Sequence, residues 1–224
     1  LVGCFCIGKE PTGSADPYGL RRAVNGIVAV IQAKHFSLDL DELVEYSYKL
    51  YGPLLPKDDN GRVKSFIAVR IKNIMLEAGL RHDIIDAVLS NFNDIDDVFL
   101  RAGAIDKSID KAWFEGLRQS ADRVARISKA ATRGEVREAD LEDIEEKHLS
   151  EVYLTINWET EELINKDDYI GAIKKLTSLT KPIENFFEKV LVMHQDERLK
   201  SNRLALLKSI SNLYLKIANF SKIV

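Results

Sequence analysis

Apolar side chains recur at spacings of three and four residues along most of the chain, which is typical of amphipathic helices. The clearest repeat lies near the C-terminus, between Leu199 and Ile217. No alternation of apolar and polar positions persists long enough to indicate a strand. The pattern therefore predicts an all-α fold.

Local signals predict where the helices begin and end. Asp16-Pro17 combines a good N-cap with a proline that is tolerated at the first helical position, so a helix should start there and run to about residue 33. Asp39 or Asp41 could cap a second helix, which Gly52-Pro53 should stop. Further helices are expected at about 62–78, 82–91, 94–102, 106–132, 138–156 and 168–178, then from Thr180 and over the C-terminal repeat.

Composition is that of a soluble globular protein, with 46% apolar and 30% charged residues among 224. No apolar run approaches the roughly 20 residues that cross a bilayer, so we expect no membrane association. The two cysteines, Cys4 and Cys6, have no second pair that could complete a zinc site. The chain begins at Leu1 within an apolar run and without a basic region ahead of it, so we expect a piece of a longer protein and no signal peptide.

Charge is unevenly distributed, although the formal net charge is only −3. Residues 135–168 hold thirteen acidic and three basic residues, whereas residues 196–224 hold six basic and two acidic. Ahead of both ranges, one expected helix places four cations at spacings of three, three and four, which put them on a single helical stripe: Arg123, Arg126, Lys129 and Arg133. Two interpretations stay open, a solvated helix face and a surface that follows phosphates.

Arg203 falls inside the apolar stripe of the C-terminal helix, between Leu199 and Leu206. A guanidinium there must be paired, because an unpaired buried charge is very costly. We favour an ion pair with a carboxylate of another helix; contact with an RNA phosphate at a groove edge is the alternative. The aromatic residues Trp113-Phe114, Phe186-Phe187 and Tyr214 are interpreted as packing.

Motifs for catalysis are incomplete. In the segment Gly8–Ser14 the lysine precedes the loop, opposite to a nucleotide phosphate-binding loop. His82-Asp83 has the letters of a metal-dependent phosphohydrolase motif, but no spacing ties the other histidines to it. We therefore expect no catalytic residue and no metal site, and a binding role instead of catalysis.

Three blocks resemble the beta subunit of the heterotetrameric bacterial glycyl-tRNA synthetase. They are Gly13-Ser14-Ala15-Asp16-Pro17-Tyr18-Gly19-Leu20-Arg21-Arg22, then Arg81-His82-Asp83-Ile84-Ile85-Asp86-Ala87-Val88, and a C-terminal block with Pro182, Phe186-Phe187 and Asn202-Arg203-Leu204-Ala205-Leu206-Leu207. From about Ala121 onward the chain also resembles the helical anticodon-binding domain of arginyl-tRNA synthetases, although the acidic stretch from about 134 to 168 has no clear counterpart there.

The resemblance implies a helical body over residues 1–120 and an anticodon-binding helical bundle over residues 121–224. It implies a cytoplasmic part of glycine–tRNA ligase that grips the anticodon arm of tRNA-Gly. Adenylation, with ATP and Mg²⁺, would occur on an alpha subunit in a heterotetramer of two alpha and two beta subunits. No cofactor is expected in this chain. A helical scaffold or subunit-interaction module without RNA contact is the alternative.

The resemblance strengthens the RNA interpretation of the cationic stripe. On that interpretation, the RNA-binding residues are Arg123, Arg126, Lys129, Arg133, Arg198, Lys200 and Lys208, with Asn202 touching splayed loop bases. Arg21 and Arg22 could contact RNA or lock the body to other domains, and we favour locking. Arg203 is expected to be a structural ion pair.

Overall fold

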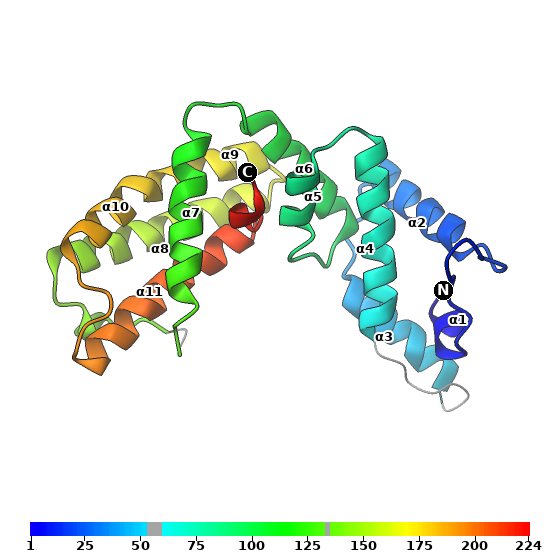
Figure 1. Ribbon diagram of the computed structural model, residues 1–224, viewed down its shortest axis with the longest axis horizontal. Coiled ribbons are helices and arrows are strands. Elements are labelled where there is room, and N and C mark those ends of the chain that lie inside the picture. Colours follow the sequence, from blue (N-terminus) through cyan, green and yellow to red (C-terminus); the bar gives the residue numbers. More distant parts are fainter. Residues whose placement is uncertain (53–59, 133–134) are drawn as a thin grey trace. The chain divides into compact units, whose positions relative to one another are not determined.

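The computed structural model describes residues 1–52, 60–132 and 135–224. Within these ranges the chain forms helices and loops and no strand, apart from an isolated bridge between Thr12 and Ala15 (Figure 1). The predicted all-α class is confirmed for this part of the chain. Contacts divide it into two compact units, Leu1–Leu100 and Arg101–Val224, called unit 1 and unit 2 below.

Unit 1 contains α1 (Val2–Cys6), α2 (Leu20–Lys34), α3 (Leu40–Tyr51), α4 (Asn60–Glu77), α5 (His82–Val88) and the start of α6 (Ile95–Ser108). Its central helix is α4, which contacts α1, α2, α3 and α5. The residues Val63, Ile67, Ile71 and Met75 follow one another at four-residue spacing along α4 and are at most 4% exposed. This row supplies the centre of the unit 1 core, as helical periodicity predicts.

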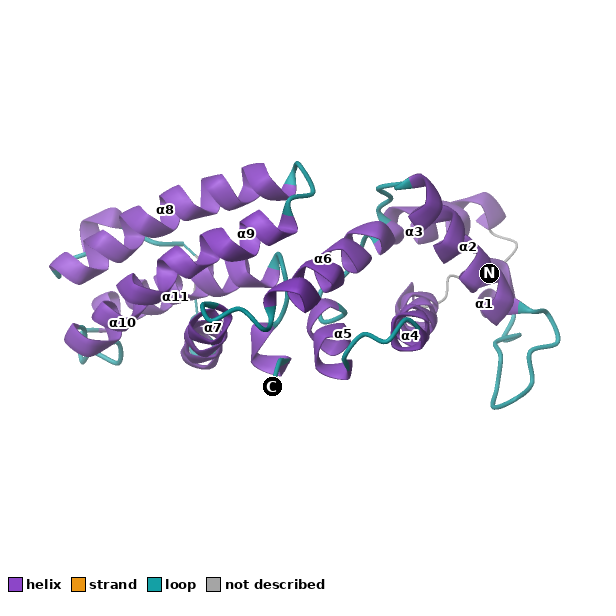
Figure 2. Ribbon diagram, turned by 90° about the horizontal axis from the view of Figure 1, so that it is seen from above, coloured by secondary structure: helices purple, strands orange, loops and turns teal. Residues whose placement is uncertain are grey.

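Unit 2 contains the rest of α6, then α7 (Phe114–Ser128), η2 (Glu138–Asp140), α8 (Ile144–Ile164) and α9 (Tyr169–Leu176). These are followed by η3 (Thr177–Leu179), α10 (Thr180–Lys189), α11 (Glu197–Leu215) and η4 (Phe220–Lys222). Helix α11 packs against α7 and α8, and α8 packs against α9 and α10 (Figure 2). Because α11 has neighbours on several sides, all of Leu204–Leu207 is buried.

Several helix ends differ from the prediction: the helix expected at 138–156 is α8 (Ile144–Ile164), preceded by η2, and the helix expected to end at 132 ends at Ser128. Two further differences lie at the start of α2 and at the end of α6. Helix α2 begins at Leu20, three residues after Pro17, because Gly19 takes a left-handed conformation with φ of 64°. Asp16 still caps the helix from this distance: its carboxylate accepts hydrogen bonds from the backbone N–H groups of Leu20 (2.8 Å) and Arg21 (3.0 Å). The break expected near residue 104 lies instead between Ser108 and Phe114.

The predicted domain boundary at residue 120 falls inside α7, whereas contacts divide the chain between Leu100 and Arg101. Two side chains from before residue 120 explain this. Arg101 is 2% exposed and donates a hydrogen bond to the carbonyl of Ile217 at 2.8 Å. Phe114 packs edge-on against Phe220. Both therefore belong to the core of unit 2.

Among the described helices, none combines the length and the apolar character that a bilayer crossing requires.

Candidate nucleic-acid interface

Helix α7 has a buried face and a cationic face. Leu117, Ala121 and Val124 are at most 4% exposed and pack into unit 2, since α7 contacts both α10 and α11. Arg123 and Arg126 are exposed on α7, and Lys129 is exposed at its C-cap. The fourth predicted cation, Arg133, lies outside the described residues. Three members of the predicted stripe thus reach solvent.

The pairing of these cations decides whether they are available to phosphate. Arg126 lies 3.1 Å from the carboxylate of Asp122, one helical turn earlier, and its side chain is 69% exposed. Pairs of this kind contribute only about 0.3–0.5 kcal/mol, so a phosphate can displace the carboxylate. Lys129 has no ion pair with any residue of the described ranges. Both cations are therefore accessible.

Arg123 is held differently, over an aromatic ring. Its guanidinium carbon lies 4.0 Å from the ring centroid of Phe187 on α10, which is a cation–π contact. From the sequence, Phe187 was expected to pack in the core together with Phe186. Phe186 is fully buried, but Phe187 is half-buried. Two consecutive helical residues point about 100° apart, so the pair Phe186-Phe187 already signalled that one ring lies toward the surface.

A shallow groove of about 140 Å³ lies between α7 and α10 beside this contact. It is lined by Gly116, Gln119, Ser120, Arg123, Ile183, Glu184 and Phe187. Apolar, hydrogen-bonding and charged groups thus meet in one small depression on unit 2.

Arg198 is held by carboxylates of the acidic segment. Its guanidinium lies 2.8 Å from Asp140 and 2.7 Å from Glu142, and Asp196 is 3.6 Å away. Hydrogen bonds to Asp140 and Glu142 raise the pKa of Arg198. Because a phosphate would have to displace several carboxylates at once, we leave Arg198 out of the proposed RNA surface.

The other predicted positions on α11 differ from one another. Lys200 is 28% exposed and pairs with Glu197 at 2.9 Å. Lys208 is half-buried, and no ion pair to a described residue is found for it. Neither adds a strongly exposed cation to the stripe of α7.

The position of Asn202 differs from the one expected from the sequence. The side chain was expected to touch RNA bases, but Asn202 is 0% exposed. Its amide oxygen accepts from the backbone N–H of Arg137 at 2.8 Å, and its amide nitrogen donates to the carbonyl of Arg137 at 3.0 Å. Both ends of the side chain therefore fix the segment before η2 onto α11, and the amide cannot reach a base.

Arg203 lies in an ion pair at the base of α8. It is 4% exposed, and its Nε contacts the carboxylate of Glu146, which is 0% exposed. Its terminal nitrogens donate to Asp143 at 2.8 Å and to the carbonyl of Leu191 at 2.9 Å. Asp143 and Glu146 also form the capping box of α8. One guanidinium thereby links the start of α8 to α11.

The acidic segment as a whole is largely neutralised within unit 2. Besides the partners of Arg198 and Arg203, four of its glutamates face lysines: Glu145 with Lys189, Glu159 with Lys175, Glu161 with Lys216 and Glu162 with Lys166. The pKa values of Glu145 and Glu161 are lowered, in each case first by a hydrogen bond from the paired lysine. The segment thus holds helices together, a role that its composition did not reveal.

In unit 1, Arg21 and Arg22 border the loop that precedes α2. Arg21 donates a hydrogen bond to the carbonyl of Gly13 at 2.7 Å, which closes the loop onto the helix. Gly13 has φ of 51° and Gly19 has φ of 64°, conformations that favour glycine. Arg22 is exposed. Arg21 therefore holds the loop before α2 against the start of that helix.

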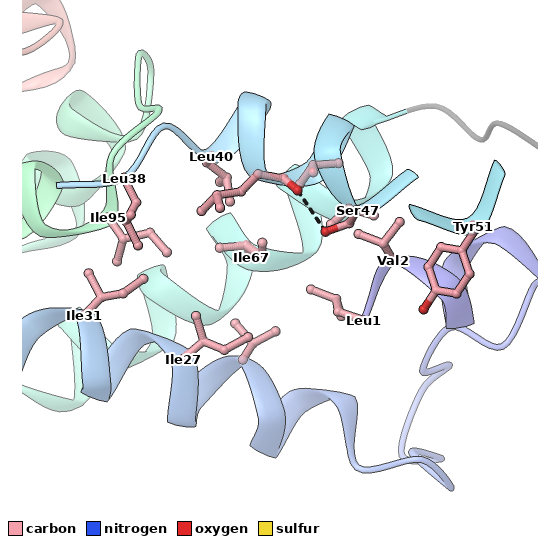
Figure 3. A pocket seen from close by; sticks show the side chains of 14 residues that line it. Leu1, Val2, Ile27, Ile31, Leu38, Leu40, Ser47, Tyr51, Ile67 and Ile95 are labelled. Atoms are coloured by element: carbon pink, nitrogen blue, oxygen red, sulfur yellow. Dashed lines mark hydrogen bonds between the residues drawn. The ribbon is translucent and has the colours of Figure 1, made fainter. Parts of the chain in front are cut away.

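The largely apolar pocket of unit 1 has a volume of about 340 Å³ and lies among α2, α3 and α4 (Figure 3). Ile27, Ile31, Leu40 and Ile67 are among its lining residues, and Ser47 there donates a hydrogen bond to the carbonyl of Leu43 at 2.8 Å. Among the described residues, its lining includes no charged side chain. It offers nothing that would attract a phosphate.

The phosphohydrolase alternative required a metal cluster around His82 and Asp83. His82 is exposed, and Asp83 is held by the guanidinium of Arg81 at 2.6 Å. The described residues contain no group of three or more His, Cys, Asp or Glu that could hold a metal ion.

Comparison with known proteins adds two family matches. Residues 1–90 match the family "Glycyl-tRNA synthetase beta subunit", and residues 118–219 match the "DALR anticodon binding domain". The predicted resemblance to the glycyl-tRNA synthetase beta subunit is confirmed. Proteins named glycine–tRNA ligase beta subunit align with this chain along its length. The beta subunit of Desulforamulus reducens is 38% identical over 230 residues, which cover 100% of this chain and 33% of that protein.

Two further beta subunits give the same extent of match. That of Actinobacillus succinogenes is 38% identical over 99% of this chain, and that of Clostridioides difficile is 33% identical over 100% of it. In each case the aligned part is 33% of the relative. The chain thus spans about a third of the length of these beta subunits. The anticodon-binding match begins within α7 and ends at residue 219, just before η4. It therefore lies entirely within unit 2.

Proposed function

We propose that unit 2 binds the anticodon arm of tRNA-Gly as part of glycine–tRNA ligase. The observation that carries the proposal is the match of residues 118–219 to an anticodon-binding domain. The exposed cations of α7, Arg126 and Lys129, lie inside the matched range and supply what a phosphate backbone requires. A partner subunit, with ATP, would carry out the aminoacylation, while this chain holds the RNA.

The proposed surface is narrower than the one expected from the sequence. It consists of Arg123, Arg126 and Lys129, since Arg198 is held by carboxylates and Asn202 is buried. Lys200 and Lys208 would lie at most at the edge of the proposed RNA surface. Backbone contacts of this kind position an RNA but carry no sequence information.

A charge-reversal experiment tests the proposal. The double substitution Arg126→Glu and Lys129→Glu should weaken binding of tRNA-Gly to the full-length chain with its partner subunit by at least about tenfold, because two attractive contacts become repulsive. The thermal unfolding temperature should stay nearly unchanged, since both side chains are exposed. Binding is measured by filter retention or fluorescence anisotropy.

Lys166→Glu provides a matched control. Lys166 is 70% exposed and lies 3.6 Å from Glu162 one turn earlier, which closely resembles the exposure and pairing of Arg126. The control should bind tRNA-Gly as the unmodified protein does. Equal binding by the double variant and the control would contradict the proposal.

A scaffold without RNA contact is the second candidate, and one observation favours it: many cations of unit 2 are paired with carboxylates. The charge-reversal experiment distinguishes the two candidates. If unit 2 is a scaffold without RNA contact, neither the double variant nor Lys166→Glu should change binding of tRNA-Gly.

A further inference from the structure

The groove between α7 and α10 is lined by a cation–π pair, Arg123 and Phe187. Arg123 of α7 lies over the ring of Phe187 of α10, with 4.0 Å between the guanidinium carbon and the ring centroid. Phe187 covers one face of the guanidinium, and Arg123 as a whole is exposed. Unstacked RNA bases are bound on aromatic rings and on guanidinium planes. Because the ring already orients the guanidinium, little further ordering is needed when a base stacks on it.

The size of the groove limits what it can take. Its volume of about 140 Å³ is well below the roughly 300–1,000 Å³ of a pocket for a drug-sized ligand. Gly116 lines the groove on the α7 side without a side chain that would fill it. A Cβ added there would lie 3.7 Å from Thr180 Cγ2, an ordinary contact distance. A single flat ring system fits these dimensions better than a whole nucleotide, whose sugar and phosphate would stay outside.

The polar groups of the groove favour one kind of base. The Nε2 of Gln119 donates to Glu115 at 2.6 Å, which leaves the Oε1 of Gln119 as an acceptor. The carboxylate of Glu184 only accepts, and its contact with Lys181 is an exposed one at 3.3 Å. Two acceptors select a base that carries an exocyclic amine; carboxylates, for example, accept from N4 of cytosine. Uracil has no such amine.

We propose that this groove binds one unstacked base of the tRNA, stacked on Arg123 with its exocyclic amine turned toward Gln119 and Glu184. The inference rests on the proposed RNA-binding function of unit 2 and adds to it a site that reads a base. The cations Arg126 and Lys129 would hold the phosphates, and the groove would supply selectivity.

The platform is tested with Phe187→Leu, which keeps an apolar side chain but removes the ring. Binding of tRNA-Gly to the full-length chain with its partner subunit should weaken by about tenfold, the order of one base-stacking contact, because Arg123 loses the ring that orients it beneath the base. With 2-aminopurine placed at successive positions of the anticodon loop, fluorescence should change on binding at one position, and Phe187→Leu should abolish that change. Phe187→Tyr keeps the ring and should retain both properties.

Phe92→Leu is the matched control. Lys64 lies over the ring of Phe92 in unit 1 with 5.5 Å to the centroid, so this variant also removes a half-buried ring beneath a cation. It should leave tRNA binding and the 2-aminopurine signal unchanged. A loss of binding in Phe92→Leu equal to that in Phe187→Leu would overturn the inference.

Selectivity is tested at the loop position that 2-aminopurine identifies. The unmodified protein should prefer cytosine over uracil at that position by about tenfold. The double variant Gln119→Met and Glu184→Gln should bring the ratio close to one while tRNA with uracil binds as before. An unchanged ratio would overturn the assignment of the groove as a base-reading site.

The two proposals fail separately. If Arg126→Glu with Lys129→Glu weakens binding but Phe187→Leu changes neither affinity nor the fluorescence signal, unit 2 binds RNA and the groove does not take a base. If none of these variants alters binding, both proposals are wrong.

Discussion

Arg203 carries its charge in the interior of unit 2, where a charge is stable only when it is paired. Its partners Glu146 and Asp143 lie at the start of α8. These ion pairs therefore hold the start of α8 against α11. The same contact withdraws Arg203 from any direct role in RNA binding.

Arg203→Ala should lower the free energy of unfolding by about 3 kcal/mol, because Glu146 would be left buried without a partner. Denaturant titration measures this loss. Arg198→Ala is the control on the same helix; its side chain is 46% exposed, so its ion pairs are screened by solvent and their loss should lower the free energy of unfolding clearly less. A similar loss in both variants would show that the burial of Arg203 does not govern its contribution.

Glu115 gives a prediction about pH. Hydrogen bonds from Arg118 and Gln119 lower the pKa of Glu115 from its ordinary 4.5 to about 2. The folded state therefore favours the charged form, and the stability that Glu115 contributes is present above pH 4.5 and is lost as the pH falls toward 2. Glu115→Gln should make the fall in stability between these values shallower, as followed by circular dichroism. Because Glu115 is exposed, the change should be small.

Glu151→Gln serves as the comparison, since Glu151 is exposed and its side chain has no ion pair within the described residues. It should leave the acid unfolding curve as it is. If Glu115→Gln gives the unmodified curve too, the hydrogen bonds of Glu115 do not persist in solution.

Which residues are accessible could be predicted from the sequence only in part. Periodicity placed Arg123, Arg126 and Lys129 on one stripe, and the structure leaves them exposed. It could not identify the partners of Arg198 and Asn202, because these lie 58 and 65 positions away along the chain. A local pattern specifies the face on which a side chain lies, whereas distant segments decide what that side chain meets.

At the scale of elements, the spacing of apolar residues predicted where the helices lie, but it did not predict every residue at which a helix begins or ends. Asp16 was recognised as a cap, but the short turn between it and Leu20 was not, since the left-handed Gly19 leaves no trace in hydrophobic periodicity. The break near residue 104 was expected between helices at 94–102 and 106–132, whereas α6 continues through Gly103 to Ser108, since a glycine inside a helix costs little enough to be tolerated.

Asp16→Ala tests the cap of α2. Removing the acceptor for the N–H groups of Leu20 and Arg21 should lower the thermal unfolding temperature of unit 1, because two backbone donors at the start of α2 lose their partner. Asp16→Asn keeps one acceptor oxygen and should lose clearly less. Thermal unfolding measures both, and an Asp16→Ala protein as stable as the unmodified one would mean that Gly19 alone sets the start of the helix.

At the scale of the whole molecule, the division at residue 100 predicts which pieces can fold. A polypeptide of residues 95–224 keeps α6 and α7 whole, whereas residues 121–224 lack Phe114 and Leu117, which are at most 1% exposed in unit 2. The longer piece should unfold cooperatively on heating, and the shorter one should show no cooperative transition by circular dichroism. Cooperative unfolding of residues 121–224 would move the boundary back to the position expected from the sequence.

The internal pairing of carboxylates with lysines and arginines in unit 2 also determines how ionic strength should act. Each RNA phosphate neutralised by a protein cation releases condensed counterions, and the affinity falls with added salt by a slope of about −0.7 to −0.9 per contact. With Arg126 and Lys129 holding phosphates while Arg123 lies beneath a base, these two contacts should contribute a slope of about −1.4 to −1.8. A binding site with so few phosphate contacts gains little nonspecific attraction for other RNAs, and its preference for one tRNA would survive at salt concentrations that release more basic proteins.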